Sequence, residues 1–149
     1  MELLRKVASF GLEKEELKNI YFLFIRSILE QSATVWHSSL TEENKDDLER
    51  IQKSAVRIIM GEEYKGYKKS LEKLDIERLD TRRERLCLVF ALKTTKNKKM
   101  KKMFPLRNKE HEMITRQPEK YIVHQAKTER LKKSSIIYMQ NLLNMHENR

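Results

Sequence analysis

Two adjacent carboxylates are the side chains of this sequence whose type most suits catalysis. Asp46 and Asp47 lie in the run TEENKDDLER, and paired carboxylates can hold catalytic metal ions. The same run also begins an amphipathic helical pattern, in which acidic residues of the first turns stabilise the positive end of the helix dipole. We therefore interpret the pair as a solvated helix start and predict no metal site there.

The other reactive side chains lack the spacing that a catalytic or metal site needs. No two histidines lie four positions apart, as a pair of metal ligands on one helix face would. The histidines are His37, His111, His124 and His146. Cys87 is the one cysteine, which excludes an intrachain disulfide and a cysteine-based zinc motif, and its apolar neighbours indicate a small core residue. Neither a glycine-rich phosphate loop nor a G-x-S-x-G motif occurs. The sequence predicts no catalytic residue, metal or cofactor.

The basic residues are concentrated in one segment. The chain has a net charge of +10 over 149 residues. Residues 1–92 contain 17 basic and 17 acidic side chains, residues 93–133 contain 14 and 4, and residues 134–149 contain one of each. The whole excess of ten therefore lies in residues 93–133. This asymmetry indicates a neutral body with a basic arm, which is typical of proteins that bind a polyanion.

Ten basic residues of this arm are candidate contacts to nucleic-acid phosphates. Phosphate contact needs mobile cations rather than a rigid pocket. A solvated linker or a nuclear-import-like patch would have a similar composition, so these alternatives stay open. The candidates are Lys96, Lys98, Lys99, Lys101, Lys102, Arg107, Lys109, Arg116, Lys132 and Lys133.

Helical periodicity and a low content of glycine (3) and proline (2) predict an all-α fold, a small helical bundle. The central helix is expected within Leu17 to Trp36, and the polar stretch Ser32 to Ser39 around Trp36 should end it. Its core-facing stripe is expected to contain Leu17, Ile20, Tyr21, Phe24, Ile28 and Val35. The chain has no run of about 20 apolar residues, so we predict no membrane span.

Local signals predict the ends of the other helices. Thr41 is a good N-cap, and Gly61 is well placed to follow the last turn of the same helix. Thr81 and Glu84 fit a capping box at the start of the last long helix. Ser134 and Ser135 precede a short terminal helix, which should fold back onto the body.

These signals divide the chain into three segments. We expect a helical body over residues 1–95, a poorly regular basic arm over 96–133, and a short helix and tail over 134–149. The residues expected to pin the arm are Met103, Phe104, Tyr121 and Val123.

Several segments of the sequence carry a family resemblance, in chain order from about Leu3 to Asn144. They are IYFLFIRSILEQSATVWHSSLTEE, LERIQKSAVRII-G, SLEKLDIERLDTRRERLCLVFALKT, MFP, YIVHQAKTER and SSIIYMQNLLN. The most specific combination is IRS-LE-----W followed by LE-IQ--A-R-I-G. In these segments the chain resembles the C-terminal region of reverse transcriptases from non-LTR retrotransposons of the LINE or jockey-like type.

The resemblance implies a thumb and post-thumb segment, which is helical and holds template and primer without performing chemistry. In that family the palm, with its aromatic-x-Asp-Asp motif, lies upstream. The implied partners are RNA or an RNA/DNA duplex and an upstream polymerase module. The chain begins inside an amphipathic pattern, as expected of a fragment. Three origins stay open: a gene fragment, a pseudogene product and a domesticated protein.

Two functions remain from the sequence. One is a non-catalytic nucleic-acid-binding segment, and the alternative is a helical protein-interaction or structural remnant. The chain opens without a secretory signal pattern, so we expect an intracellular location, cytoplasmic or nuclear.

Overall fold

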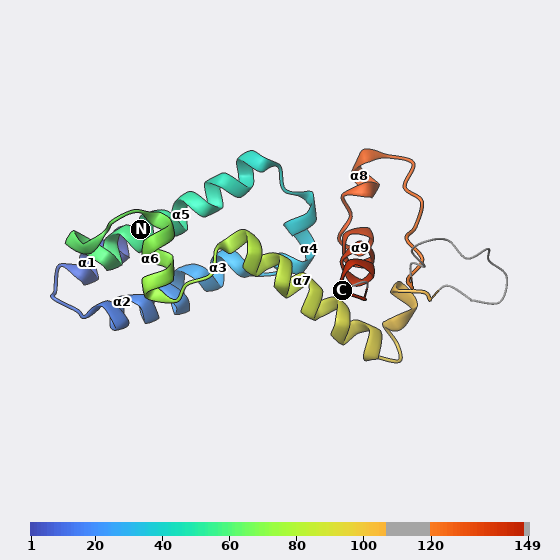
Figure 1. Cartoon of the computed structure of the whole chain (residues 1–149), viewed down its shortest axis with the longest axis horizontal. Coiled ribbons are helices and arrows are strands. Elements are labelled where there is room, and N and C mark those ends of the chain that lie inside the picture. Colours follow the sequence, from blue (N-terminus) through green and yellow to red (C-terminus); the bar gives the residue numbers. More distant parts are fainter. Residues whose placement is uncertain (107–119, 148–149) are drawn as a thin grey trace. The chain divides into compact units, whose positions relative to one another are not determined.

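Helices form the regular structure of the residues that the computed structural model describes, 1–106 and 120–147 (Figure 1). Extended pairing in this part of the chain is limited to one isolated antiparallel bridge, between Leu106 and Tyr121. The predicted all-α fold is therefore confirmed. None of the described helices is long and apolar enough to cross a membrane.

The chain forms two compact units. Unit 1 contains Met1–Ala33 and Leu40–Arg83, and unit 2 contains Thr34–Ser39 and Glu84–Arg149. These units have other boundaries than the three segments 1–95, 96–133 and 134–149, which stay a prediction about the organisation of the chain.

Unit 1 is built from short N-terminal helices and a longer helix packed with them. Its elements are α1 (Glu2–Ala8), α2 (Lys14–Ile20), the π-helix η1 (Tyr21–Arg26), α3 (Ser27–Glu30), α5 (Glu42–Met60), the 3₁₀ turn η3 (Gly61–Glu63), α6 (Tyr67–Leu74) and the first residues of α7 (Leu79–Lys96). Its apolar core gathers side chains from α1, α2, η1, α5 and α6, among them Leu4, Leu17, Val56 and Leu71.

The predicted central helix ends close to Ser32, the first residue of the stretch expected to end it, but it is not α-helical throughout. In its place α2, η1 and α3 follow one another, and the chain then breaks at Gln31 and Ser32 before α4 (Ala33–Trp36). Ser32 has a φ of 53°, which an α-helix cannot contain.

The predicted burial of Phe24 and Ile28 is also wrong. Their side chains are 57% and 69% exposed, and Val35 is 68% exposed. The buried and half-buried positions instead advance by four, through Leu17, Tyr21, Ile25, Leu29 and Ala33. A π-turn closes i→i+5 hydrogen bonds, so it is wider than an α-turn and rotates the side chains that follow. The prediction from the sequence assumed about 3.6 residues per turn throughout. It therefore placed the wrong face of this helical segment toward the core.

The ends of α5 agree with the sequence signals. Thr41 is the N-cap, and its Oγ1 accepts a hydrogen bond from the backbone N–H of Asn44 at 3.2 Å. The helix ends at Met60, and Gly61 follows with a φ of 52°. A glycine adopts a positive φ without a Cβ clash. Both predicted ends are confirmed.

The predicted capping box at Thr81 and Glu84 is wrong, because α7 begins two residues earlier at Leu79. The backbone N–H of Leu79 donates to Oε2 of Glu49 at 3.2 Å. A carboxylate from α5 thus satisfies a free amide of the first turn of α7. A partner 30 positions away leaves no local sequence signal.

A buried hydrogen-bond network centred on Gln52 joins the elements of unit 1. The Tyr21 hydroxyl donates to Oε1 of Gln52 at 2.6 Å. The Gln52 amide donates to the hydroxyl oxygen of Tyr67 and to the carbonyl oxygen of Glu77, each at 3.0 Å. Tyr67 in turn donates to Oε1 of Glu49 at 2.5 Å. The Gln52 amide thus uses both of its N–H groups and its carbonyl oxygen.

The environment raises the pKa of both tyrosines of this network. Burial raises the pKa of Tyr21 above its usual value. Burial, together with the hydrogen bond to Glu49, raises the pKa of Tyr67 in the same direction. Both hydroxyls therefore stay hydrogen-bond donors to a higher pH than an ordinary tyrosine.

Unit 2 contains the remainder of α7, the 3₁₀ turns η2 (His37–Ser39) and η4 (Lys101–Met103), α8 (Glu129–Lys132) and α9 (Ser135–Glu147). Its core brings together Cys87, Ala91, Phe104, Tyr121, Met139, Leu142 and Leu143. Cys87 is thus the small core residue that the sequence predicts, and the terminal helix α9 shares a core with α7. Of the residues expected to pin the arm, Phe104 and Tyr121 are buried, Val123 is half-buried and Met103 is exposed.

Replacing Tyr21 by phenylalanine is expected to lower the free energy of unfolding by about 1–3 kcal/mol. The ring and its packing are kept, but the carbonyl oxygen of Gln52 loses its buried donor. Chemical denaturation followed by circular dichroism measures the change.

The matched control on the same helical segment is Phe24→Ala. Because Phe24 is exposed, its truncation should change the free energy of unfolding by no more than about 0.5 kcal/mol. A larger loss for Phe24→Ala than for Tyr21→Phe would mean that Phe24 faces the core.

Candidate nucleic-acid interface

Five of the candidate lysines lie together where α7 ends. Lys96 is the last residue of α7, Lys98 and Lys99 lie in the turn that follows, and Lys101 and Lys102 begin η4. All five side chains are exposed. We call this stretch, residues 96–102, the lysine turn.

Asn97 fixes the backbone of the lysine turn. Its Oδ1 accepts hydrogen bonds from the backbone N–H groups of Lys99 at 2.9 Å and Met100 at 3.3 Å. Its carbonyl oxygen accepts from the N–H of Lys101 at 2.9 Å. The sequence reasoning missed this residue, although an asparagine after a helix end is a recognisable turn signal.

Helix α9 holds the residues on both sides of the undescribed part of the arm. Gln140 donates from Nε2 to the carbonyl oxygen of Met103 at 3.0 Å. Asn144 pairs with the backbone of Tyr121, accepting from its N–H at 2.9 Å and donating to its carbonyl oxygen at 3.0 Å.

Both amides are buried and were missed from the sequence. The available signal was two amide side chains at i, i+4 inside the apolar pattern of the last helix. Polar groups on a buried face require partners, so such a pair predicts hydrogen bonds to a neighbouring segment.

The lysine turn has no internal counterion in the described residues. None of the five lysines forms an ion pair with a described residue. Residues 93–106 contain no aspartate or glutamate. Five cations on a short, fixed backbone therefore present positive charge to solvent. Such cations can neutralise phosphates.

The other candidates of the arm differ in their surroundings. Lys132 pairs with Glu129 at 2.6 Å, and this contact lowers the pKa of Glu129. Lys133 is exposed, and its carbonyl oxygen accepts from the Ser38 hydroxyl at 2.8 Å. Arg107, Lys109 and Arg116 lie outside the residues that the structure describes.

The carboxylate pair of the sequence lies on the surface of unit 1. Asp46 and Asp47 are exposed in the first turns of α5, and Asp47 pairs with Arg50 at 2.9 Å. Over residues 1–106 and 120–147, no group of three histidine, cysteine, aspartate or glutamate side chains could hold a metal ion.

Comparison with known proteins does not define a family. Neither a protein-family model, nor a curated protein, nor a solved structure matches the chain. The fold class is therefore an all-α protein with a basic segment, and the resemblance to reverse transcriptases stays a prediction.

Replacing Asn144 by alanine is expected to lower the free energy of unfolding of the protein by about 1–3 kcal/mol, because the buried backbone of Tyr121 loses both hydrogen-bond partners. Thermal unfolding followed by circular dichroism measures the loss. The control is Asn141→Ala, at an exposed position of the same helix, which should have little effect. Equal losses for the two variants would show that the Asn144–Tyr121 pair does not hold the arm.

Proposed function

We propose that this chain is a non-catalytic nucleic-acid-binding segment whose partner is RNA or an RNA/DNA duplex. The observation that carries the proposal is the lysine turn. Its five exposed ammonium groups lie within seven residues, and they have no ion-pair partner in the described part of the chain.

The chemistry of lysine favours phosphate contact without sequence recognition. An ammonium group is a compact point charge on a flexible stem, so it follows phosphates but does not read base edges as a bidentate side chain does. The resemblance to the thumb and post-thumb segment of non-LTR retrotransposon reverse transcriptases supports the same function. It adds an upstream polymerase module as a second partner and a cytoplasmic or nuclear place of action.

The salt dependence of binding tests the proposal. Each neutralised phosphate contributes about −0.7 to −0.9 to the slope of log affinity against log salt. If four or five lysines engage, replacing all five of the lysine turn by glutamine should flatten this slope by about 3–4 units. Fluorescence anisotropy with a labelled RNA and an RNA/DNA hybrid at several salt concentrations measures it.

A matched variant separates the site from the net charge. It carries five glutamine substitutions at exposed positions of unit 1, which lower the charge equally: Arg5, Lys6, Arg50, Lys53 and Lys68. We expect this control to keep most of the parent slope. Equal flattening in the two variants would contradict the proposal, since overall charge alone would then explain the binding.

The proposal also predicts that the isolated chain does not extend a primer. Primer extension with Mg²⁺ or Mn²⁺ and highly purified protein is the measurement, and no product above background is expected. Template-dependent extension that disappears in a variant with Asp46→Ala and Asp47→Ala would refute a non-catalytic role.

One observation favours the alternative, a helical protein-interaction segment. Leu23, Phe24 and Ile28 expose 68%, 57% and 69% of their side chains on the π-helix and α3. Large exposed apolar patches mark interaction surfaces, and these three side chains could contribute to one. Binding to a polypeptide that is insensitive to salt, with no affinity for RNA or hybrid, would favour this alternative.

A further inference from the structure

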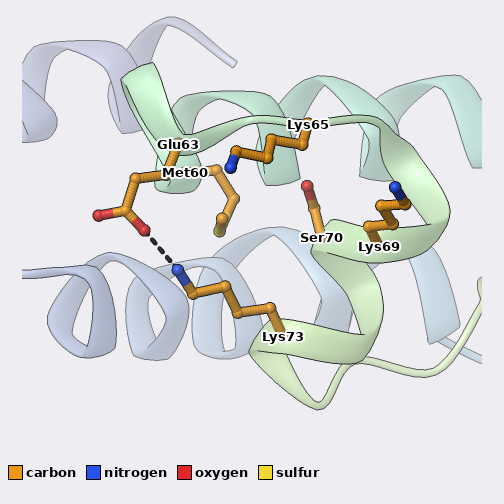
Figure 2. Close-up of a pocket in the computed structure, with 6 residues that line it drawn as sticks. All are labelled: Met60, Glu63, Lys65, Lys69, Ser70 and Lys73. Atoms are coloured by element: carbon orange, nitrogen blue, oxygen red, sulfur yellow. Dashed lines mark hydrogen bonds and ion pairs between the residues drawn. The ribbon is translucent and has the colours of Figure 1, made fainter.

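A pocket in unit 1 is lined by charged and polar groups that the proposed nucleic-acid contact does not use. The pocket has a volume of about 390 Å³. It lies beside the end of α5, η3 and one side of α6 (Figure 2). Its lining residues are Met60, Glu63, Lys65, Lys69, Ser70 and Lys73.

Ser70 gives the pocket an unsatisfied polar group. The residue is 1% exposed, and its Oγ has no hydrogen-bond partner in the described part of the chain. In the view of Figure 2 its hydroxyl lies between the side chains of Lys65 and Lys69. A buried hydroxyl without a partner is unfavourable, so a ligand oxygen in the pocket would complete its hydrogen bonding. The side chains around it are flexible lysines with exposed ends, which can move to admit such an oxygen.

The pocket also carries an excess of positive charge. Lys65 and Lys69 are exposed and form no ion pair with a described residue. Lys73 contacts Glu63 at 2.5 Å, and Lys14 pairs with the same carboxylate. These two lysines lower the pKa of Glu63 to about 2. Four lysines against one carboxylate leave a net charge of three at this place.

We infer that this pocket binds a phosphate group with two negative charges, as in inorganic phosphate or a phosphomonoester. Lys65, Lys69 and Lys73 neutralise the charge, and the Ser70 hydroxyl donates to a phosphate oxygen. A volume of about 390 Å³ exceeds the size of a phosphate ion, which leaves room for the organic group of an ester.

Glu63 is the internal counterion of the pocket lysines. Its carboxylate holds Lys14 and Lys73, and its negative charge opposes an incoming anion. Removing that charge should therefore strengthen phosphate binding, which sets Glu63 apart from the lysines of the same pocket. The inference concerns residues of unit 1 and does not depend on the lysine turn.

The experiment is a titration of the full chain with inorganic phosphate at constant ionic strength, adjusted with sodium chloride. Backbone amide chemical shifts of residues 67–74 report the binding. We expect saturable shifts in the parent protein. Ser70→Ala, which leaves the net charge unchanged, should weaken binding roughly three- to tenfold.

Neighbouring residues supply controls of equal charge. Lys69→Gln should weaken phosphate binding, whereas Lys68→Gln, on the same helix but outside the pocket, should not. Glu63→Gln should tighten it, whereas Glu62→Gln should have little effect. Shifts that do not saturate, or equal effects within each pair of variants, or unchanged affinity in Ser70→Ala, would overturn the inference.

Two further arms identify the source of the phosphate and separate the pocket from the proposed function. Binding of thymidine 5′-monophosphate but not thymidine indicates a phosphomonoester ligand, and binding of inorganic phosphate alone indicates the free ion. The variant with glutamine at all five positions of the lysine turn should keep the phosphate titration. If it loses the titration, the phosphate binds at the lysine turn and the pocket assignment is wrong.

Discussion

The packing of unit 1 depends on one buried amide. Gln52 connects the π-helix, α5, α6 and the segment before α7 through Tyr21, Tyr67 and the carbonyl oxygen of Glu77. An amide offers one acceptor and two donors, and here each has a partner. A fully satisfied polar network in a core restricts how helices can pack, because another arrangement would leave buried groups without partners. The apolar side chains of the same core tolerate more arrangements, since their attraction has no direction.

The residues that carry the family resemblance have structural roles in this network and beside it. Glu49 and Gln52 belong to the motif LE-IQ--A-R-I-G, and both are members of the buried network. Arg26 and Glu30 belong to the motif IRS-LE-----W. Arg26 lies 3.6 Å from the centre of the Phe22 ring, and Glu30 pairs with both Arg26 and Arg82.

These four motif residues therefore hold helices of unit 1 together. Residues with such packing roles are evidence about the fold and not about an activity. The functional argument has to come from exposed groups, and for this chain those groups are cations.

The sequence predicted the features that depend on a few neighbouring residues. Thr41 caps α5 through an amide three positions away, and Gly61 provides a positive φ at its own position. The predictions failed where contacts outside the local sequence signal determine where a helix begins or which of its faces is buried. Helix α7 begins at Leu79, whose N–H donates to Glu49 of α5. The π-helix Tyr21–Arg26 is a second case, because it changes which side chains of the N-terminal helices face the core. An assumed α-helical period therefore placed Phe24 inside. The amino-acid composition was enough to identify the lysines of the candidate interface. Gln140 and Asn144 anchor the neighbouring backbone through their side-chain amides, and only the contacts in the structure show this role.

The two groups of lysines in the chain differ in physical kind. In the lysine turn the backbone is fixed by Asn97, but the cations themselves are mobile and exposed, so their interaction with an anion is mainly counterion release and is screened by salt. In the pocket of unit 1 the cations surround a buried Ser70 hydroxyl, which has a direction and a fixed position. A directed donor discriminates among anions by where their oxygen atoms lie, and salt screens it less than it screens surface charge. A long polyanion therefore suits the lysine turn, and a single phosphate group suits the pocket.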